Sequence, residues 1–147
     1  MSYRILFVED NRDDVELMEH ELRSAKIDFV STQVTRKKDL AERVREFEPN
    51  IILVDYSLGS FNGIDAFRMI KAEQQHMPFI LVTGALSEQV ALEFLEEGVD
   101  DFILKSSFKR LPAAIINAVR KKDQERERHR MGLELQKSHA ELMSLIE

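Results

Sequence analysis

The chain has 147 residues, of which 27 are Asp or Glu and 21 are Lys or Arg, so its formal net charge is −6. This length suits one compact domain with a short addition. The absence of cysteine excludes disulfide scaffolds, thiolate metal sites and cysteine nucleophiles. The acid excess disfavours nucleic-acid binding, and no apolar run matches a signal peptide or a membrane span. We therefore expect a soluble, cytoplasmic protein that binds neither nucleic acid nor membrane.

Apolar runs and helical periodicities alternate along the chain. The first apolar run, 5–8, stops at two acids, and apolar positions three or four residues apart then predict a helix over 13–25. A weakly alternating stretch predicts an edge strand at 29–34, followed by a helix that ends before Pro49. The same alternation continues with three more strands, each followed by a helix; these strands are expected at 51–54, 79–82 and 102–104.

Five strands that alternate with five helices predict an α/β fold. The expected architecture is a doubly wound, five-stranded parallel sheet with helices on both faces and right-handed connections. Ligands of such sheets bind outside the carboxyl ends of the strands, at the point where the strand order reverses. The residues that directly follow the apolar runs are therefore the candidates for function.

Polar residues stand directly after four of the five strands. Glu9 and Asp10 follow the first strand, Asp55 the third, Thr83 the fourth and Lys105 the fifth. Three carboxylates on one rim repel one another unless a cation shares the site, and ligands that are all oxygen suit Mg²⁺. Lys105 and Thr83 then remain to bind an anionic group beside the metal. The set predicts phosphoryl transfer to Asp55.

Four segments of the chain resemble the receiver domains of two-component response regulators. They are Phe7-Val8-Glu9-Asp10, Ile52-Leu53-Val54-Asp55 followed by Gly63, Val82-Thr83-Gly84-Ala85, and Asp101-Phe102-Ile103-Leu104-Lys105. The resemblance extends over about residues 3–122 and implies a flavodoxin-like receiver fold with an extended C-terminal helix.

The resemblance also implies a role for each matching residue. Asp55 accepts phosphate from a histidine kinase or a histidine phosphotransfer protein, and the domain catalyses its own phosphorylation and slow dephosphorylation. Thr83 and Lys105 bind the phosphoryl group. Thr83 and Phe102 act as a switch that reshapes the surface near the fourth helix, the fifth strand and the fifth helix. The implied ligands of Mg²⁺ are Glu9, Asp10, Asp55 and the backbone carbonyl of Ser57.

Some residues also have plainer interpretations. Phe102 taken alone fits an ordinary core position. Ser106 follows Lys105 where the family usually has proline in a cis peptide; a non-proline cis bond costs about 3–4 kcal/mol, so this peptide is either trans, with a rearranged loop, or strained. His139 faintly resembles the phosphoacceptor segment of histidine kinases, but the residues that normally follow are missing, so we interpret it as a solvated helix residue.

The C-terminal part predicts a helical extension. We expect a receiver domain at 1–122 and an extension at 123–147 that continues the last helix, which begins near Leu111 after a loop over 106–110. A short heptad seam is formed by Met131, Leu135, Ser138, Leu142 and Leu145. It indicates a coiled coil that joins two copies into a homodimer, or a linker; a helix that lies on its own domain is the alternative. The chain is then either a stand-alone receiver or a piece of a longer kinase or signalling protein.

Two other functions are alternatives to the phosphorelay hypothesis. One is a Mg²⁺-dependent phosphohydrolase with an aspartyl nucleophile, but that class needs a second carboxylate two residues after the nucleophile, where this chain has Ser57. The other is a phosphate-independent adaptor that dimerises through its C-terminal helix. The presence of Asp55, Thr83 and Lys105 weighs against the adaptor.

Overall fold

The computed structural model describes residues 2–58, 62–85 and 87–146. Its elements follow one another as β1 (Tyr3–Val8), α1 (Arg12–Ser24), β2 (Phe29–Val34), α2 (Lys37–Phe47), β3 (Ile51–Asp55), α3 (Gly63–Glu73), β4 (Phe79–Thr83), α4 (Glu88–Glu97), β5 (Asp101–Leu104), the 3₁₀ helix η1 (Phe108–Arg110) and α5 (Leu111–Ile146). The predicted alternation of strands and helices is confirmed throughout these ranges.

The strands form one parallel sheet in the order β2-β1-β3-β4-β5. The order reverses between β1 and β3, which lie side by side with Val8 opposite Val54. The carboxyl ends of these two central strands therefore bring the residues after Val8 next to Asp55. The doubly wound parallel fold expected from the sequence is confirmed.

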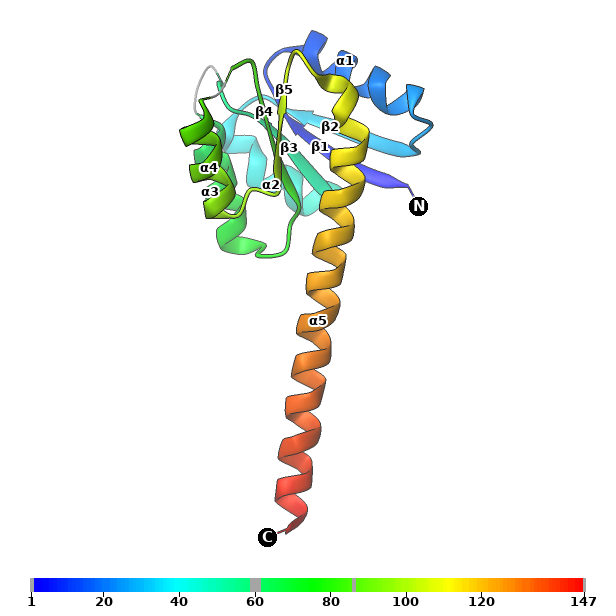
Figure 1. Ribbon diagram of the computed structural model, residues 1–147, viewed down its shortest axis with the longest axis vertical. Helices are drawn as coiled ribbons and strands as arrows, with labels where there is room; N and C mark the ends of the chain where they lie inside the picture. Colours follow the sequence, from blue (N-terminus) through cyan, green and yellow to red (C-terminus); the bar gives the residue numbers. More distant parts are fainter. Residues whose placement is uncertain (1, 59–61, 86, 147) are drawn as a thin grey trace.

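Each central strand contributes side chains to two separate cores, because successive side chains point to opposite faces of the sheet. In β1, Leu6 and Val8 pack on the face covered by α2, α3 and α4, whereas Ile5 and Phe7 pack on the face covered by α1 and α5 (Figure 1). All four side chains are fully buried. Burial on both faces explains why the central strands read as unbroken apolar runs rather than as alternating sequences.

The connection between β5 and α5 differs from the expected loop. Phe108–Arg110 form η1, and the Phe108 side chain is buried in the core beneath α1 and α5. The loop predicted at 106–110 is therefore wrong for these three residues, because one buried aromatic holds a single turn that is too short to show a period. The Lys105–Ser106 peptide is trans. Helix α5 begins at Leu111, as predicted.

Helix α5 is continuous from the domain core to the end of the described chain. Its first turns bury Ile115 and Val119 against the sheet, and the helix then projects away from the body as a rod (Figure 1). In the described ranges, no helix combines the length and apolarity needed to cross a membrane.

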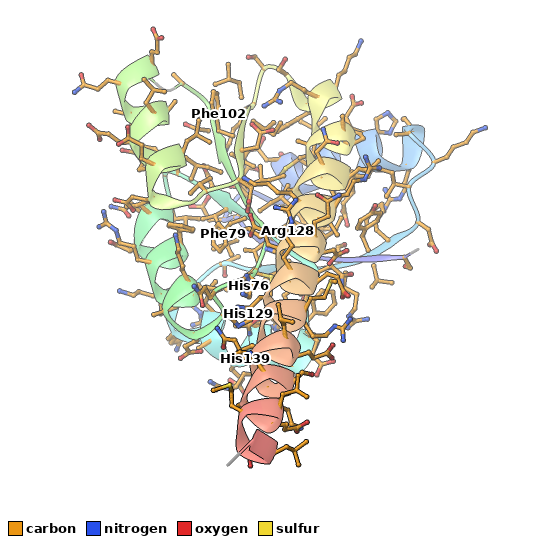
Figure 2. The ribbon with its side chains drawn as sticks, turned by 60° about the horizontal axis from the view of Figure 1, so that its bottom comes forward. His76, Phe79, Phe102, Arg128, His129 and His139 are labelled. Atoms are coloured by element: carbon orange, nitrogen blue, oxygen red, sulfur yellow. The ribbon has the colours of Figure 1, made fainter. Side chains whose placement is uncertain are left out.

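Three contacts fasten the start of the rod to the body. Lys122 Nζ lies 3.6 Å from Asp100 Oδ1, and Arg126 Nη2 donates a hydrogen bond to the carbonyl of His76 (2.8 Å). The rings of His76 and His129 lie side by side, with centroids 5.7 Å apart (Figure 2). Contacts with the body thus reach His129, while the division of the chain at residue 122 stays a prediction.

Candidate functional site

Three carboxylates meet where the sheet order reverses. Glu9, Asp10 and Asp55 each offer an oxygen atom, and these atoms all lie within 4.8 Å of one another. Glu9 and Asp55 are 1% and 4% exposed, whereas Asp10 is exposed. The arrangement follows from the fold, because β1 and β3 are neighbours and both strands end at this rim.

Glu9 is fixed in place by its own backbone and by the start of α1. Its N–H donates to the carbonyl of Val34 (3.1 Å), and its Oε1 accepts from the N–H of Asn11 (3.1 Å). Burial raises the pKa of the Glu9 carboxyl to about 8; the Asp55 carboxylate adds to this effect, while the Asn11 N–H and Lys105 oppose it. Within the described ranges, the buried Oε2 of Glu9 accepts no hydrogen bond.

Asp55 is held by the turn that follows β3. Its Oδ1 accepts from the backbone N–H of Ser57 (3.2 Å), and the N–H of Tyr56 donates to Val82 on β4 (2.8 Å). Gly63 at the start of α3 passes close to this turn, since a Cβ atom at position 63 would lie 2.5 Å from the carbonyl oxygen of Asp55. A glycine at this position therefore allows α3 to begin directly against the strand that carries Asp55.

Lys105 brings the positive charge of the site. From the end of β5, its Nζ lies 3.2 Å from Asp55 Oδ2 and 3.5 Å from Glu9 Oε2. Its contact with Asp14 Oδ2 is shorter, at 2.7 Å. Partial burial works against the charge of Lys105, but the hydrogen bond to Asp14 and the charges of Glu9 and Asp55 outweigh it and raise its pKa. Lys105 thus remains protonated among the carboxylates.

Asp14 is the member of the site that the sequence did not reveal. It lies in the first turn of α1, where an acid is already explained by the helix dipole and where the Asn11 side chain caps the helix by accepting from its N–H. Its position one turn into a helix that starts at the rim, after a strand ending in two acids, is the signal that marks it. The Asp14 carboxylate holds the resting position of Lys105.

The remaining predicted residues lie around this centre. Thr83 is buried at the end of β4, and its Oγ1 donates to the carbonyl of Ala85 (3.1 Å). Phe102 on β5 is half-buried against the core beneath α2, α3 and α4; its role as a switch stays a prediction. Ser57 contributes its N–H to Asp55; the role of its carbonyl in metal binding stays a prediction.

The donor set fits a hard divalent cation. The three grouped candidate ligands are carboxylate oxygens, and two of these residues, Glu9 and Asp55, are buried. In the described part of the chain, Oε2 of Glu9 accepts no hydrogen bond, and Lys105 at 3.5 Å does not offset the effect of burial, which raises the pKa of this carboxyl. A cation bound to the three carboxylates would offset this cost of burial.

Several known proteins are similar to this chain in sequence. The sequence profile of the response regulator receiver domain matches residues 5–116. The DNA-binding response regulator MtrA of Mycobacterium tuberculosis is 30% identical over 126 residues, which cover 85% of this chain and 54% of MtrA. The response regulator PleD of Caulobacter vibrioides is 34% identical over 107 residues, covering 71% of this chain and 23% of PleD. The matched part thus spans about half the length of MtrA and 23% of the length of PleD.

Solved structures show the same fold. The signal receiver domain of a Luxo repressor protein from Vibrio parahaemolyticus superposes with a TM-score of 0.74 at 21% identity, covering 85% of this chain and 95% of that one. The Mn²⁺-bound form of response regulator Rcp1 superposes with a TM-score of 0.64 at 23% identity, covering 76% and 90%.

Proposed function

Because this chain belongs to the family of response regulator receiver domains, we propose that it is a phosphoacceptor of a two-component phosphorelay, in which Asp55 takes the phosphoryl group of a phosphohistidine. The observation that carries the proposal is the position of Asp55: a buried carboxylate at the point where the strand order reverses, 3.2 Å from the Lys105 ammonium and grouped with Glu9 and Asp10.

The residues around Asp55 divide the work of the transfer. Asp55 Oδ1 is oriented by the N–H of Ser57, so the carboxylate presents its other oxygen toward Lys105. Lys105 pairs with the negative charge of the incoming phosphoryl oxygens, and the Thr83 hydroxyl leaves the Ala85 carbonyl to donate to them. The leaving imidazole departs as Asp55 becomes an acyl phosphate.

The carboxylates prepare the site for Mg²⁺. Glu9, Asp10, Asp55 and the carbonyl of Ser57 are the residues that would hold the ion, whose contribution is to neutralise charge on the phosphoryl oxygens. The Rcp1 relative was solved with Mn²⁺, which has the same charge and also accepts oxygen ligands. Without a divalent ion, the ammonium group of Lys105 is shared among Asp14, Asp55 and Glu9.

A surface near Phe102 is suited to report the modification. A hollow between α4 and β5 is lined by Ala91, Leu92, Leu95, Phe102 and Leu104, together with Ser87 and Glu88. Leu92 and Leu95 are exposed there. When Thr83 turns toward a phosphoryl group, space near the end of β4 changes, and Phe102 is the aromatic side chain on the neighbouring strand that can move in response. The output surface proposed here is therefore formed by α4, β5 and the start of α5.

Two partners follow from this function. One is a histidine kinase or a histidine phosphotransfer protein, the donors with which the receiver domains of this family interact. The other is a second copy of this chain, bound through the exposed apolar residues of the α5 extension.

The test uses acetyl phosphate as a small donor with MgCl₂ and intact mass as the readout. We expect one phosphoryl adduct on the native chain, none on Asp55→Asn, and an unchanged adduct on Asp28→Asn, an exposed acid before β2 at the amino end of the sheet, opposite the site. EDTA is expected to abolish the adduct. Lys105→Ala is expected to lower the yield of the adduct at least ten-fold, because the site loses the ammonium group of Lys105.

Two outcomes would decide for the competing functions. Continuous hydrolysis of a phosphomonoester without an accumulating adduct would favour the phosphohydrolase. No adduct together with no Mg²⁺ binding by calorimetry would overturn the proposal in favour of a phosphate-independent adaptor.

A further inference from the structure

The lower half of α5 exposes a row of apolar side chains. The exposed fractions are 57% for Met131, 72% for Leu135, 61% for Leu142 and 82% for Leu145. They lie on the part of the helix that projects away from the body, beyond the contacts at His76 (Figure 1). The domain to which they are attached does not cover them.

The row has the geometry of one half of a coiled coil. With Leu135 and Leu142 at heptad position a, position d is taken by Met131, Ser138 and Leu145. A hollow on this face is lined by Met131, Glu134, Leu135 and Ser138, with Gly132 at its side. These four are the d, g, a and d residues that form a hole in knobs-into-holes packing. Leu135 of a second helix is the knob that matches this hole.

The charges beside the seam select the direction of the second helix. Position g is occupied by Glu127, Glu134 and Glu141, and position e includes Gly132 and His139. Parallel helices place g against e of the partner, five residues further on, so Glu134 meets His139 of the second copy. Antiparallel helices place g against g, which sets glutamates against glutamates.

The body end of the seam is marked by polar residues. Arg128 at position a and Gln124 at position d precede Met131, and two copies of Arg128 at one level repel each other. The paired region therefore starts at Met131, just beyond the contacts with the body that reach His129.

We propose that residues 131–146 form a parallel, two-stranded coiled coil with a second copy of this chain, in register, with Glu134 of each copy beside His139 of the other. The seam is self-complementary, because each helix carries both the glutamate and the histidine, as a two-fold symmetric pair requires. The inference rests on the homodimer proposed above and adds its direction, register and charged contacts.

Cysteine cross-linking tests the direction, since the natural chain contains no cysteine. In the full chain, Leu145→Cys places two thiols at one d layer of a parallel pair, whereas Ser144→Cys places them on outer faces. Under mild oxidation we expect Leu145→Cys to form a covalent dimer at least ten times faster than Ser144→Cys. In an antiparallel pair, position 145 lies at opposite ends of the two helices. A dimer by light scattering that fails to cross-link through Leu145→Cys would therefore overturn the proposal.

Substitutions at one position separate the two directions independently. His139→Lys creates a Glu–Lys contact in a parallel pair and is expected to lower the concentration at which the dimer half-forms by about five-fold; His139→Glu is expected to raise it by about five-fold. In an antiparallel pair position e meets position e, so both substitutions weaken association. Weakening by both, a trimeric mass, or a monomer at every concentration would refute the proposal.

These readouts do not involve phosphate. Failure of the coiled coil leaves the phosphorylation of Asp55 to be judged by its own mass measurement, and failure of phosphorylation leaves the cross-linking result unaffected.

Discussion

At the scale of single residues, the site is defined by a shortage of positive charge. Lys105 is shared among Asp14, Asp55 and Glu9, with its shortest contact to Asp14. Of these carboxylates, Glu9 is the most deeply buried, and burial raises its pKa. In the absence of a divalent ion, Glu9 therefore keeps its proton to a higher pH than an exposed glutamate. The divalent ion proposed for this site and the proton on Glu9 are therefore competitors.

This competition predicts a pH-dependent stability. The unfolded Glu9 carboxyl loses its proton near its ordinary pKa of 4.5, while the folded one keeps it up to about 8. Between these values the folded state binds more protons, so without divalent ions the free energy of unfolding falls as pH rises, by up to about 1.4 kcal/mol per pH unit. Urea unfolding of Glu9→Gln in EDTA is expected to lack this slope.

The control for that measurement is Glu93→Gln, an exposed acid on α4 that should keep the slope. Added Mg²⁺ is expected to stabilise the native chain more at pH 8 than at pH 5, because the ion binds the deprotonated carboxylates. Equal slopes in native and Glu9→Gln chains would show that Glu9 does not carry the effect.

The residue scale also shows how far the sequence determines the site. The positions of Glu9, Asp10, Asp55 and Lys105 were predictable because these residues stand at the ends of apolar runs, and parallel strands bring those ends together. Asp14 was not, because its contact with Lys105 spans 91 positions and depends on how α1 leaves the rim.

At the scale of elements, one buried ion pair adds to the apolar packing that attaches α5 to the body. Asp100, between α4 and β5, has a side chain 2% exposed; its Oδ2 accepts from the N–H of Phe79 (2.8 Å), and its Oδ1 faces Lys122 Nζ at 3.6 Å. Burial raises the pKa of Asp100, against the effects of the Phe79 N–H and of Lys122. One carboxylate thus joins the loop before β5, the start of β4 and α5.

Removal of the cation from this pair should weaken the attachment. Lys122→Met is expected to lower the free energy of unfolding by about 1–3 kcal/mol near neutral pH, because a buried carboxylate loses its partner. The loss should shrink in acid, where Asp100 becomes neutral. The exposed Arg120→Met, two residues earlier on α5, serves as the control in the same denaturant titration; an equal loss there would point to helix propensity rather than to the pair.

The start of α5 could be predicted from the sequence only in part. The start of α5 at Leu111 was predictable because Pro112 is tolerated in a first turn, but η1 was not, since three residues with one buried Phe108 leave no period to read. The side-chain contacts of α5 beyond residue 122 were likewise invisible, because they depend on where the turn before β4 places His76.

At the scale of the whole molecule, the chain combines a body that buries its apolar residues on both faces of a sheet with a rod that exposes them. The contacts of Arg126 and His129 with the turn at His76 lie between these two parts. The body's stability should therefore depend on the rod only as far as these contacts reach.

Two truncations test this division. At concentrations that keep the chain monomeric, a chain ending at Arg130 is expected to unfold with the free energy of the full chain. A chain ending at Lys122 is expected to lose about 1 kcal/mol, the worth of a hydrogen bond and a ring contact. Equal unfolding of both truncated chains would show that the contacts at His76 contribute nothing to the body.

The continuity of α5 has a mechanical consequence. The turns that pack Ile115 and Val119 into the core and the turns that carry Leu142 and Leu145 belong to one helix. No proline lies between them, and Gly132 is helical like its neighbours. Below His129 the helix extends by roughly 1.5 Å per residue, or about 25 Å to Ile146. A tilt of about 10° at the body would thus move its tip by about 4 Å. Helix α5 is a lever whose short arm lies inside the core, so a small repacking there becomes a displacement at the far end.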